Sequence, residues 1–224
     1  MIKNISNLGD AALYCDFGKE VNKKTNLKVI KYFKNLKEKK IEGIINLTPS
    51  YNKLIISFDL KITSFKEIKK ELESLIISED QSENSKRIII PVCCADSFSL
   101  DIKRLESKLS MNRDKIYESF FNKDYFCYMT GFIAGMPFLG DLDKNLRANR
   151  LETPRVKVPK GSIGLTEQFA NVYTFESPGG WNIIGNTPIK IFDNSKTENP
   201  NLISPGDIVT FKEISFNDYR NYNE

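Results

Sequence analysis

The sequence predicts an α+β protein, in which an N-terminal ferredoxin-like βαββαβ domain precedes an all-β barrel domain. In residues 1–92, strand-like apolar runs alternate with segments of helical periodicity. After Tyr125 the chain is rich in Gly, Pro and β-forming residues, with frequent turn signals. Its 224 residues suffice for one large core or two small ones. We therefore expect domains of residues 1–92 and 93–224, the second opening with a helical connection.

The first elements alternate strand, helix and hairpin. Residues 11–17, AALYCDF, have the composition of a strand. Apolar residues then recur at helical spacing among lysines, which predicts an amphipathic helix that ends at Gly43; they are Leu27, Ile30, Phe33 and Leu36. GIINL at 43–47 and LIISF at 54–58 flank the turn PSYN, so these two strands are expected to form a hairpin.

A second helix and a fourth strand complete the predicted βαββαβ order. Ser64 and Glu67 have the spacing of a capping box, and the following apolar residues lie on one helical face: Ile68, Leu72, Leu75 and Ile76. A polar loop at 78–86, SEDQSENSK, leads to RIIIPV at 87–92. This apolar run predicts a buried strand that closes the N-terminal sheet.

The second domain is expected to begin with two short helices. Leu100, Ile102 and Leu105 predict the first, and Ser110 is expected to cap the second, which runs through Ile116 and Phe120. The clearest strands of the barrel follow, namely VYTFE at 172–176, WNIIG at 181–185, IKIFD at 189–193 and DIVTFKEI at 207–214.

Composition excludes several classes of function. The net charge of +4 is too small to indicate nucleic-acid binding. No apolar run approaches the length of about 20 residues that spans a bilayer, and the N-terminus lacks the features of a secretory signal. Four cysteines without a CxxC pair indicate reduced thiols, so we expect a cytoplasmic protein. The absence of histidine excludes Ser-His-Asp and Cys-His catalysis and the usual zinc sites, and we expect no metal.

Two glycine- and proline-rich segments each have a structural and a functional interpretation. GFIAGMPFLG at 131–140 is typical of a barrel corner, or of a loop whose amides bind a carboxylate or phosphate. In TPRVKVPKGS at 153–162, Arg155 and Lys157 lie two apart, so in an extended chain they project from one face. They form either an anion-binding pair or a solvated sheet edge.

The segment SPGGW at 177–181 is expected to be a turn that leads into a strand. Pro178 presets φ for the first central turn position, and Gly179 can take the positive φ of a type II turn. The only tryptophan of the chain, Trp181, then starts the strand and is expected to fill the barrel core.

Four motifs together resemble one family. GFIAGMPFLGDL, TPRVKVPKGSIGL, VYTFESPGGWNIIGNTP and ISPGDIVTFKEI occur in this fixed order. The chain thus resembles the family of 5-oxoprolinase B subunits, also known as allophanate hydrolase subunit 1 or KipI, of the carboxyltransferase subdomain C and D type. The resemblance implies a cyclophilin-like barrel, ATP as the cofactor of the complex, and partner subunits. The partners are a carboxylase-related C subunit and, in the 5-oxoprolinase version of the complex, a LamB/YcsF-type A subunit. No nucleic acid and no membrane are expected as partners.

The sequence departs from the family pattern at several positions. Ala134 stands where the family has a proline, and Phe120 where relatives often have a histidine. Phe169-Ala170-Asn171 replaces Gln-Thr-Gly before the Val-Tyr pair. The scaffold motifs are kept, whereas these polar groups are not.

The resemblance implies a component of an ATP-dependent complex that hydrolyses 5-oxoproline to glutamate, and this component is inactive without its partners. The alternatives are a regulator that inhibits a sensor histidine kinase, as the KipI name suggests, and an allophanate hydrolase subunit. We expect Arg155 and Lys157 to bind an anion. No nucleophile is assigned. The other candidate pocket residues are Gly161, Ser162, Glu167, Tyr173, Gly179 and Gly180.

Overall fold

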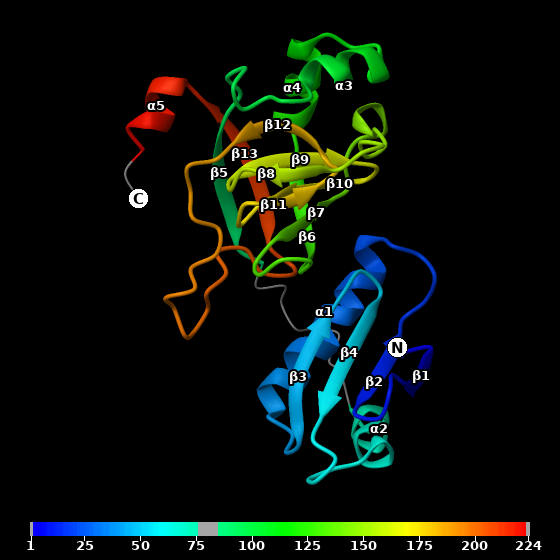
Figure 1. Cartoon of the computed structure of the whole chain (residues 1–224). Coiled ribbons are helices and arrows are strands. Elements are labelled where there is room, and N and C mark those ends of the chain that lie inside the picture. The colour runs from blue at the N-terminus through cyan, green and yellow to red at the C-terminus, as the bar shows by residue number, and fades with distance from the viewer. Residues whose placement is uncertain (1, 76–84, 223–224) are drawn as a thin grey trace. The chain divides into compact units, whose positions relative to one another are not determined.

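The computed structural model describes residues 2–75 and 85–222, in which the chain forms two compact units, Met1–Asn84 and Ser85–Glu224. The first unit is built on an antiparallel sheet of order β1-β2-β4-β3, and two helices accompany it (Figure 1). Its elements are β1 (Asn4–Asn7), β2 (Ala12–Asp16), α1 (Lys23–Lys39), β3 (Ile44–Pro49), β4 (Lys53–Phe58) and α2 (Phe65–Glu73).

The N-terminal helices begin at capped residues. The predicted capping box of α2 is confirmed, because the Ser64 hydroxyl accepts from the Glu67 amide while the Glu67 carboxylate accepts from the Ser64 amide at 2.8 Å. Helix α1 is also confirmed, but it ends at Lys40 in a left-handed conformation rather than at Gly43. Ile76 and most of the predicted polar loop lie outside the described residues.

The predicted closing strand of the N-terminal sheet belongs instead to the second unit. Strand β5 (Arg87–Cys93) pairs in parallel with β13 (Ile208–Ile214) along its whole length, as Figure 1 shows for the green and red-orange arrows. In the first sheet, β1 occupies the edge beside β2. The ferredoxin-like order is therefore not confirmed, and the units divide after Asn84 rather than at residue 92. The apolar run predicts a buried strand but carries no information about its partner.

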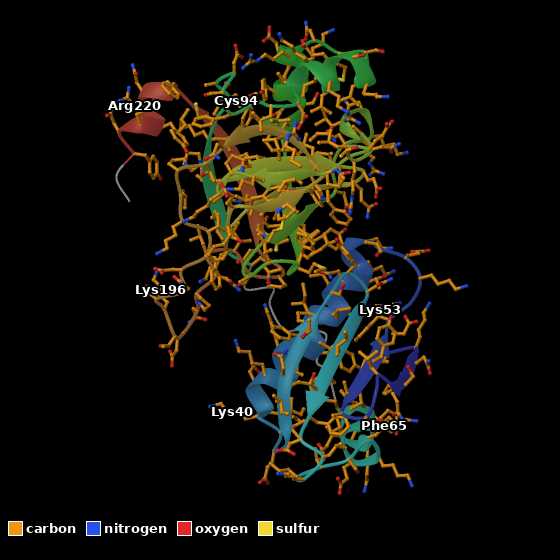
Figure 2. All side chains as sticks on the ribbon, in the orientation of Figure 1. Lys40, Lys53, Phe65, Cys94, Lys196 and Arg220 are labelled. Atoms are coloured by element: carbon orange, nitrogen blue, oxygen red, sulfur yellow. The ribbon has the colours of Figure 1, made fainter. Side chains whose placement is uncertain are left out.

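The second unit is a closed barrel of strand order β10-β7-β6-β13-β5-β12-β9, which confirms the predicted all-β half. Its other strands are β6 (Asp124–Thr130), β7 (Pro137–Gly140), β9 (Ser162–Thr166), β10 (Phe169–Val172) and β12 (Asn182–Asn186). A separate two-stranded ribbon pairs β8 (Arg155–Val158) with β11 (Ser177–Gly179). Cys94, labelled in Figure 2, belongs to the buried core of this unit, together with Ile90, Leu165 and Val209.

Helices cover parts of the barrel. They are α3 (Ile102–Leu109), α4 (Arg113–Phe121), the 3-10 turn η1 (Lys144–Leu146) and α5 (Phe216–Arg220). The predicted cap at Ser110 is wrong, because Ser110 ends α3 in a left-handed conformation with φ 51°. Asn112 caps α4 instead, and its side chain accepts from the Lys115 amide at 3.0 Å. Asparagine is among the best N-cap residues.

The predicted barrel strands are confirmed in part. WNIIG and DIVTFKEI correspond to β12 and β13. Within VYTFE, strand β10 stops at Val172, and IKIFD makes only an isolated bridge from Phe192 to Asn201. In the described part of the chain, no helix has the length and apolar character needed to cross a membrane.

Candidate functional site

The guanidinium group of Arg155 binds a buried carboxylate. Its two terminal nitrogens donate to the two oxygens of Asp101, at 2.9 and 2.7 Å. Asp101 precedes α3 and is 4% exposed, and it also accepts from the Ile183 amide at 2.7 Å. The pair therefore joins the β8–β11 ribbon to α3 and to barrel strand β12.

Lys157 has a different acidic partner. Its ammonium group lies 3.0 Å from a carboxylate oxygen of Glu176, and the lysine side chain is 75% exposed. The two cations expected to share one anion are thus each paired with a carboxylate of this chain. An exposed pair such as Lys157–Glu176 contributes little to stability.

The SPGG segment is a strand of the ribbon rather than a type II turn. Ser177 pairs with Val158 and Gly179 with Arg155, and the φ angles of Gly179 and Gly180 lie outside the left-handed region. Gly179 is required for a steric reason instead. A Cβ atom there would lie 2.1 Å from the Tyr173 hydroxyl oxygen, so only glycine fits.

Tyr173 lies buried between the ribbon and the barrel wall. It packs in an apolar cluster with Met136, Val158 and Ile183. Burial raises the pKa of the Tyr173 hydroxyl, while hydrogen bonds with the Asn171 side chain and the Trp181 backbone, and then the positive charges of Arg150 and Arg155, act in the opposite direction. The phenol therefore remains protonated at neutral pH and can donate a hydrogen bond.

Trp181 supports a cation that the sequence reasoning missed. The predicted burial of its side chain is confirmed at 6% exposure, with an edge-to-face contact to Phe138 at 5.6 Å between ring centroids. The guanidinium carbon of Arg150 lies 5.9 Å from the centroid of the Trp181 ring. The neighbouring Leu151 amide donates to the Gly180 carbonyl at 2.7 Å, which holds this chain segment beside the tryptophan.

Arg104 of α3 ties the same segment to the barrel. It donates to the side chain of Asn182 and lies 3.4 Å from the Arg150 carbonyl oxygen. Asn182 is fully buried and donates to the carbonyls of Asn149 at 3.1 Å and Leu165 at 3.0 Å. These bonds fix the backbone on which the Arg150 side chain stands.

The clustering of arginines in the sequence is a signal that could have revealed this segment. Only seven of the 33 basic residues are arginines. Three of them, Arg104, Arg150 and Arg155, lie on α3, in the chain that leads into β8 and at the first position of β8. Arginine offers a planar fork of donors suited to carboxylate and phosphate, which lysine lacks.

The remaining residues predicted to line the site make mainly backbone contacts or lie in turns. Gly161 has φ 82°, and a Cβ atom there would lie 2.5 Å from the Thr187 carbonyl oxygen. Its amide donates to the Tyr173 carbonyl at 2.7 Å, and Ser162 beside it is buried. Glu167 is exposed at the turn between β9 and β10. Gly161 and Ser162 thus contact the backbone of Tyr173, whereas Glu167 belongs to a separate turn.

The glycines of GFIAGMPFLG fit the barrel-corner interpretation. Gly135 has φ 70°, and a Cβ atom there would lie 2.5 Å from the Phe192 ring. Phe132 in the same turn is 76% exposed. The turn is therefore shaped by a close contact between Gly135 and an aromatic ring.

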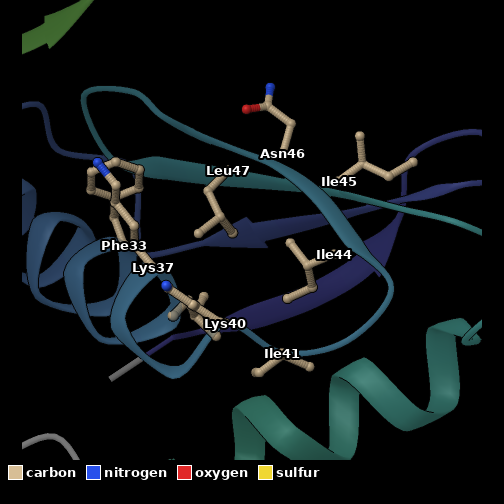
Figure 3. A pocket seen from close by; sticks show the side chains of 9 residues that line it. Phe33, Lys37, Lys40, Ile41, Ile44, Ile45, Asn46 and Leu47 are labelled. Atoms are coloured by element: carbon tan, nitrogen blue, oxygen red, sulfur yellow. The ribbon is translucent and has the colours of Figure 1, made fainter. Parts of the chain in front are cut away.

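The N-terminal unit contains a groove of about 350 Å³ (Figure 3). Apolar side chains of α1 and β3 form its walls, and two lysines lie at it; the lining residues are Phe33, Leu36, Lys37, Lys40, Ile41, Ile44, Ile45, Asn46 and Leu47. None of the site residues predicted from the sequence lines this groove. Within residues 2–75 and 85–222, no group of three potential ligands is placed to hold a metal ion.

These features define a two-unit α+β protein whose barrel presents an arginine-rich segment beside a buried tryptophan. The family described as carboxyltransferase domain, subdomain C and D, matches residues 3–203. The chain belongs to this family.

Relatives and a solved structure agree with this assignment. The chain is 33% identical to the B subunit of 5-oxoprolinase from Bacillus subtilis (strain 168), over 98% of this chain and 96% of that protein. It is 29% identical to the B subunit of 5-oxoprolinase from Haemophilus influenzae, over 93% and 96%. The crystal structure of TTHA0988 superposes with a TM-score of 0.82 at 26% identity, over 91% of this chain. This chain spans only 40% of that longer protein.

Proposed function

We propose that this chain is the B subunit of an ATP-dependent amidohydrolase complex of the 5-oxoprolinase type. The observation that carries the proposal is the 33% identity to the Bacillus subtilis B subunit over 98% of this chain and 96% of that protein. Because nearly the whole of both chains aligns, the likeness supports a common role in the complex rather than one shared domain. We also infer that the closed barrel is of the cyclophilin-like type.

The proposed reaction converts 5-oxoproline, ATP and water into glutamate, ADP and phosphate. A lactam is a poor electrophile, and transfer of a phosphoryl group to its oxygen makes attack by water feasible. The transition states of both steps carry negative charge, which cations and backbone amides stabilise. ATP supplies the phosphoryl group when bound to the complex. The arginines beside Trp181 fit an anionic group, because Arg104 and Arg150 lack a carboxylate partner within the described residues.

Within this proposal, the residues around Tyr173 shape and position the site. Arg155 acts as a positioning residue through Asp101, and the buried Tyr173 offers a hydroxyl donor. Lys157 is an exposed cation of the ribbon, and Glu167, whose amide donates to the Ala148 carbonyl at 2.9 Å, is an exposed carboxylate of the β9–β10 turn. Gly161, Ser162, Gly179 and Gly180 hold the backbone around Tyr173 and Trp181.

The proposal places the chain in a cytoplasmic hetero-oligomer. Its partners are a carboxylase-related C subunit and a LamB/YcsF-type A subunit, and the chain has no turnover alone. Both bacterial relatives are named as one lettered component of 5-oxoprolinase, which supports a role within a larger assembly.

Reconstitution tests this function. The chain is co-expressed with the carboxylase-related and LamB/YcsF-type subunits of its own genome, and 5-oxoproline-dependent release of ADP and glutamate is measured. We expect equal amounts of ADP and glutamate, and none when this chain is omitted. A complete complex that releases neither product contradicts the proposal.

A further inference from the structure

The cations near Trp181 differ in whether a carboxylate already neutralises them. Arg155 is held by Asp101 at 2.7 Å, and Lys157 lies 3.0 Å from Glu176. Arg150 is exposed and forms no ion pair within the part of the chain that the structure describes. The charge of Arg150 is therefore available to a ligand on the surface beside Trp181.

The guanidinium carbon of Arg150 lies over the ring of Trp181, 5.9 Å from its centroid, within reach of a cation–π contact. Trp181 is itself immobilised, because it is 6% exposed and packs edge-to-face on Phe138. A cation–π contact uses the charge of the guanidinium group and does not consume its N–H donors. A fork held in this way can bind both oxygens of a carboxylate or phosphate.

Arg104 adds a second positive charge next to Arg150. Its side chain donates to Asn182, and it lies 3.4 Å from the Arg150 carbonyl oxygen, so neutral oxygens surround it. The buried carboxylate that precedes the same helix, Asp101, is occupied by Arg155. The segment thus carries an excess of positive charge, which attracts anions.

We propose that Arg150, held on Trp181 and backed by Arg104, binds the anionic group of a small-molecule ligand, a carboxylate or a phosphate. The inference rests on the proposed function only for the identity of that ligand. In a 5-oxoproline hydrolase, the carboxylate of the lactam substrate and the phosphates of the nucleotide are the two sources of such a group. Arg155 then positions the ribbon and does not contact the ligand.

The position of the only tryptophan makes this inference directly testable. The intrinsic fluorescence of the full chain is titrated separately with 5-oxoproline, acetate and inorganic phosphate at constant ionic strength. We expect a saturable change with at least one of the three. A response to 5-oxoproline and acetate identifies a carboxylate site, and a response to phosphate alone identifies a phosphate site.

Two arginines three positions apart provide matched variants. Arg150→Ala is expected to weaken binding at least about tenfold, as the loss of a hydrogen-bonded charge does. Arg147→Ala removes the same charge from the same segment, but Arg147 donates to the Leu142 carbonyl at 3.0 Å and should leave affinity unchanged. Arg150→Lys keeps the charge without the fork and should bind with intermediate affinity. The near-UV circular dichroism of each variant verifies its fold.

The outcomes separate this inference from the proposed function. No saturable response at millimolar concentrations, or equal affinity of the wild type and Arg150→Ala, overturns the anion site. If anion binding depends on Arg150 but the complete complex shows no turnover, the anion site is supported and the 5-oxoprolinase proposal is contradicted. Turnover of the Arg150→Ala complex with unchanged KM values for 5-oxoproline and ATP contradicts the anion site but leaves the proposed function standing.

Discussion

Arg155 and Asp101 form a bidentate ion pair, with nitrogen–oxygen distances of 2.7 and 2.9 Å, although 54 positions separate them in the chain. The Asp101 side chain is 5% exposed and that of Arg155 is 28% exposed. The carboxylate is therefore buried while the guanidinium reaches the surface. In the proposed function, Arg155 positions the ribbon through this ion pair.

Removal of Arg155 should destabilise the fold. Arg155→Ala leaves the buried Asp101 carboxylate with the Ile183 amide as its remaining described donor, which should cost about 3 kcal/mol of unfolding free energy. Lys157→Ala, at a 75% exposed side chain, should cost no more than about 1 kcal/mol. Urea denaturation measures both. Similar small losses would show that the pair with Asp101 is not stabilising.

Two adjacent glycines should respond differently to a methyl group. Gly179→Ala forces Cβ against the Tyr173 hydroxyl and should destabilise the chain by about 1–3 kcal/mol. Gly180→Ala meets its nearest atoms at 3.6 Å, an ordinary contact, and should change stability by no more than about 0.5 kcal/mol. Thermal unfolding of the two variants makes the comparison. Equal melting temperatures would contradict the described contact at Gly179.

The cysteines should be unreactive in the folded protein. Burial raises the pKa of Cys15 and of Cys94 to about 12, and it raises the pKa of Cys127 as well. Because only the thiolate reacts, these buried thiols should be alkylated by iodoacetamide at pH 8 far more slowly than thiols of the unfolded chain. Mass spectrometry before and after addition of urea tests this. Rapid native labelling of any of the three would contradict their burial.

The Asp16–Lys53 pair should make stability depend on acid. The Lys53 ammonium at 2.6 Å and the Gly18 amide at 2.7 Å hold the pKa of Asp16 below its usual range. The pair therefore contributes stability above the unfolded pKa of about 3.9, and this contribution is lost as the pH falls through the lower folded value.

The variant Asp16→Asn isolates this contribution. It should lower the free energy of unfolding at pH 7 and have a progressively smaller effect as the pH falls below about 4. Urea denaturation of the wild type and the variant at pH 7 and at a pH below about 4 is the measurement. A loss that is the same at both would assign the effect to packing rather than to ionisation of Asp16.

The sequence allowed prediction of features that depend on neighbouring residues. The Ser64–Glu67 capping box and the amphipathic face of α1 were found because caps and periodicity are local patterns. Burial of Trp181 and the all-β second half followed from turn residues and β-forming composition. The motif string also identified the family.

Long-range partners could not be predicted in this way. Strand β5 pairs with β13, more than a hundred positions away, and an apolar run does not specify its partner. Gly179 was predicted to have a positive φ, whereas the structure requires glycine there because of Tyr173. Arg150 was missed because its proposed role depends on its cation–π contact with Trp181, which only the fold brings about.

Kinetics of the reconstituted complex test the central claim most directly. The claim is that this chain is a component of a 5-oxoprolinase and that its Arg150 binds the substrate anion. We predict 5-oxoproline-dependent ADP release with the wild type, a KM for 5-oxoproline or for ATP raised at least about tenfold by Arg150→Ala, and both KM values unchanged with Arg147→Ala. Absence of ADP release from the complete complex, or equal KM values for the two variants, would contradict it.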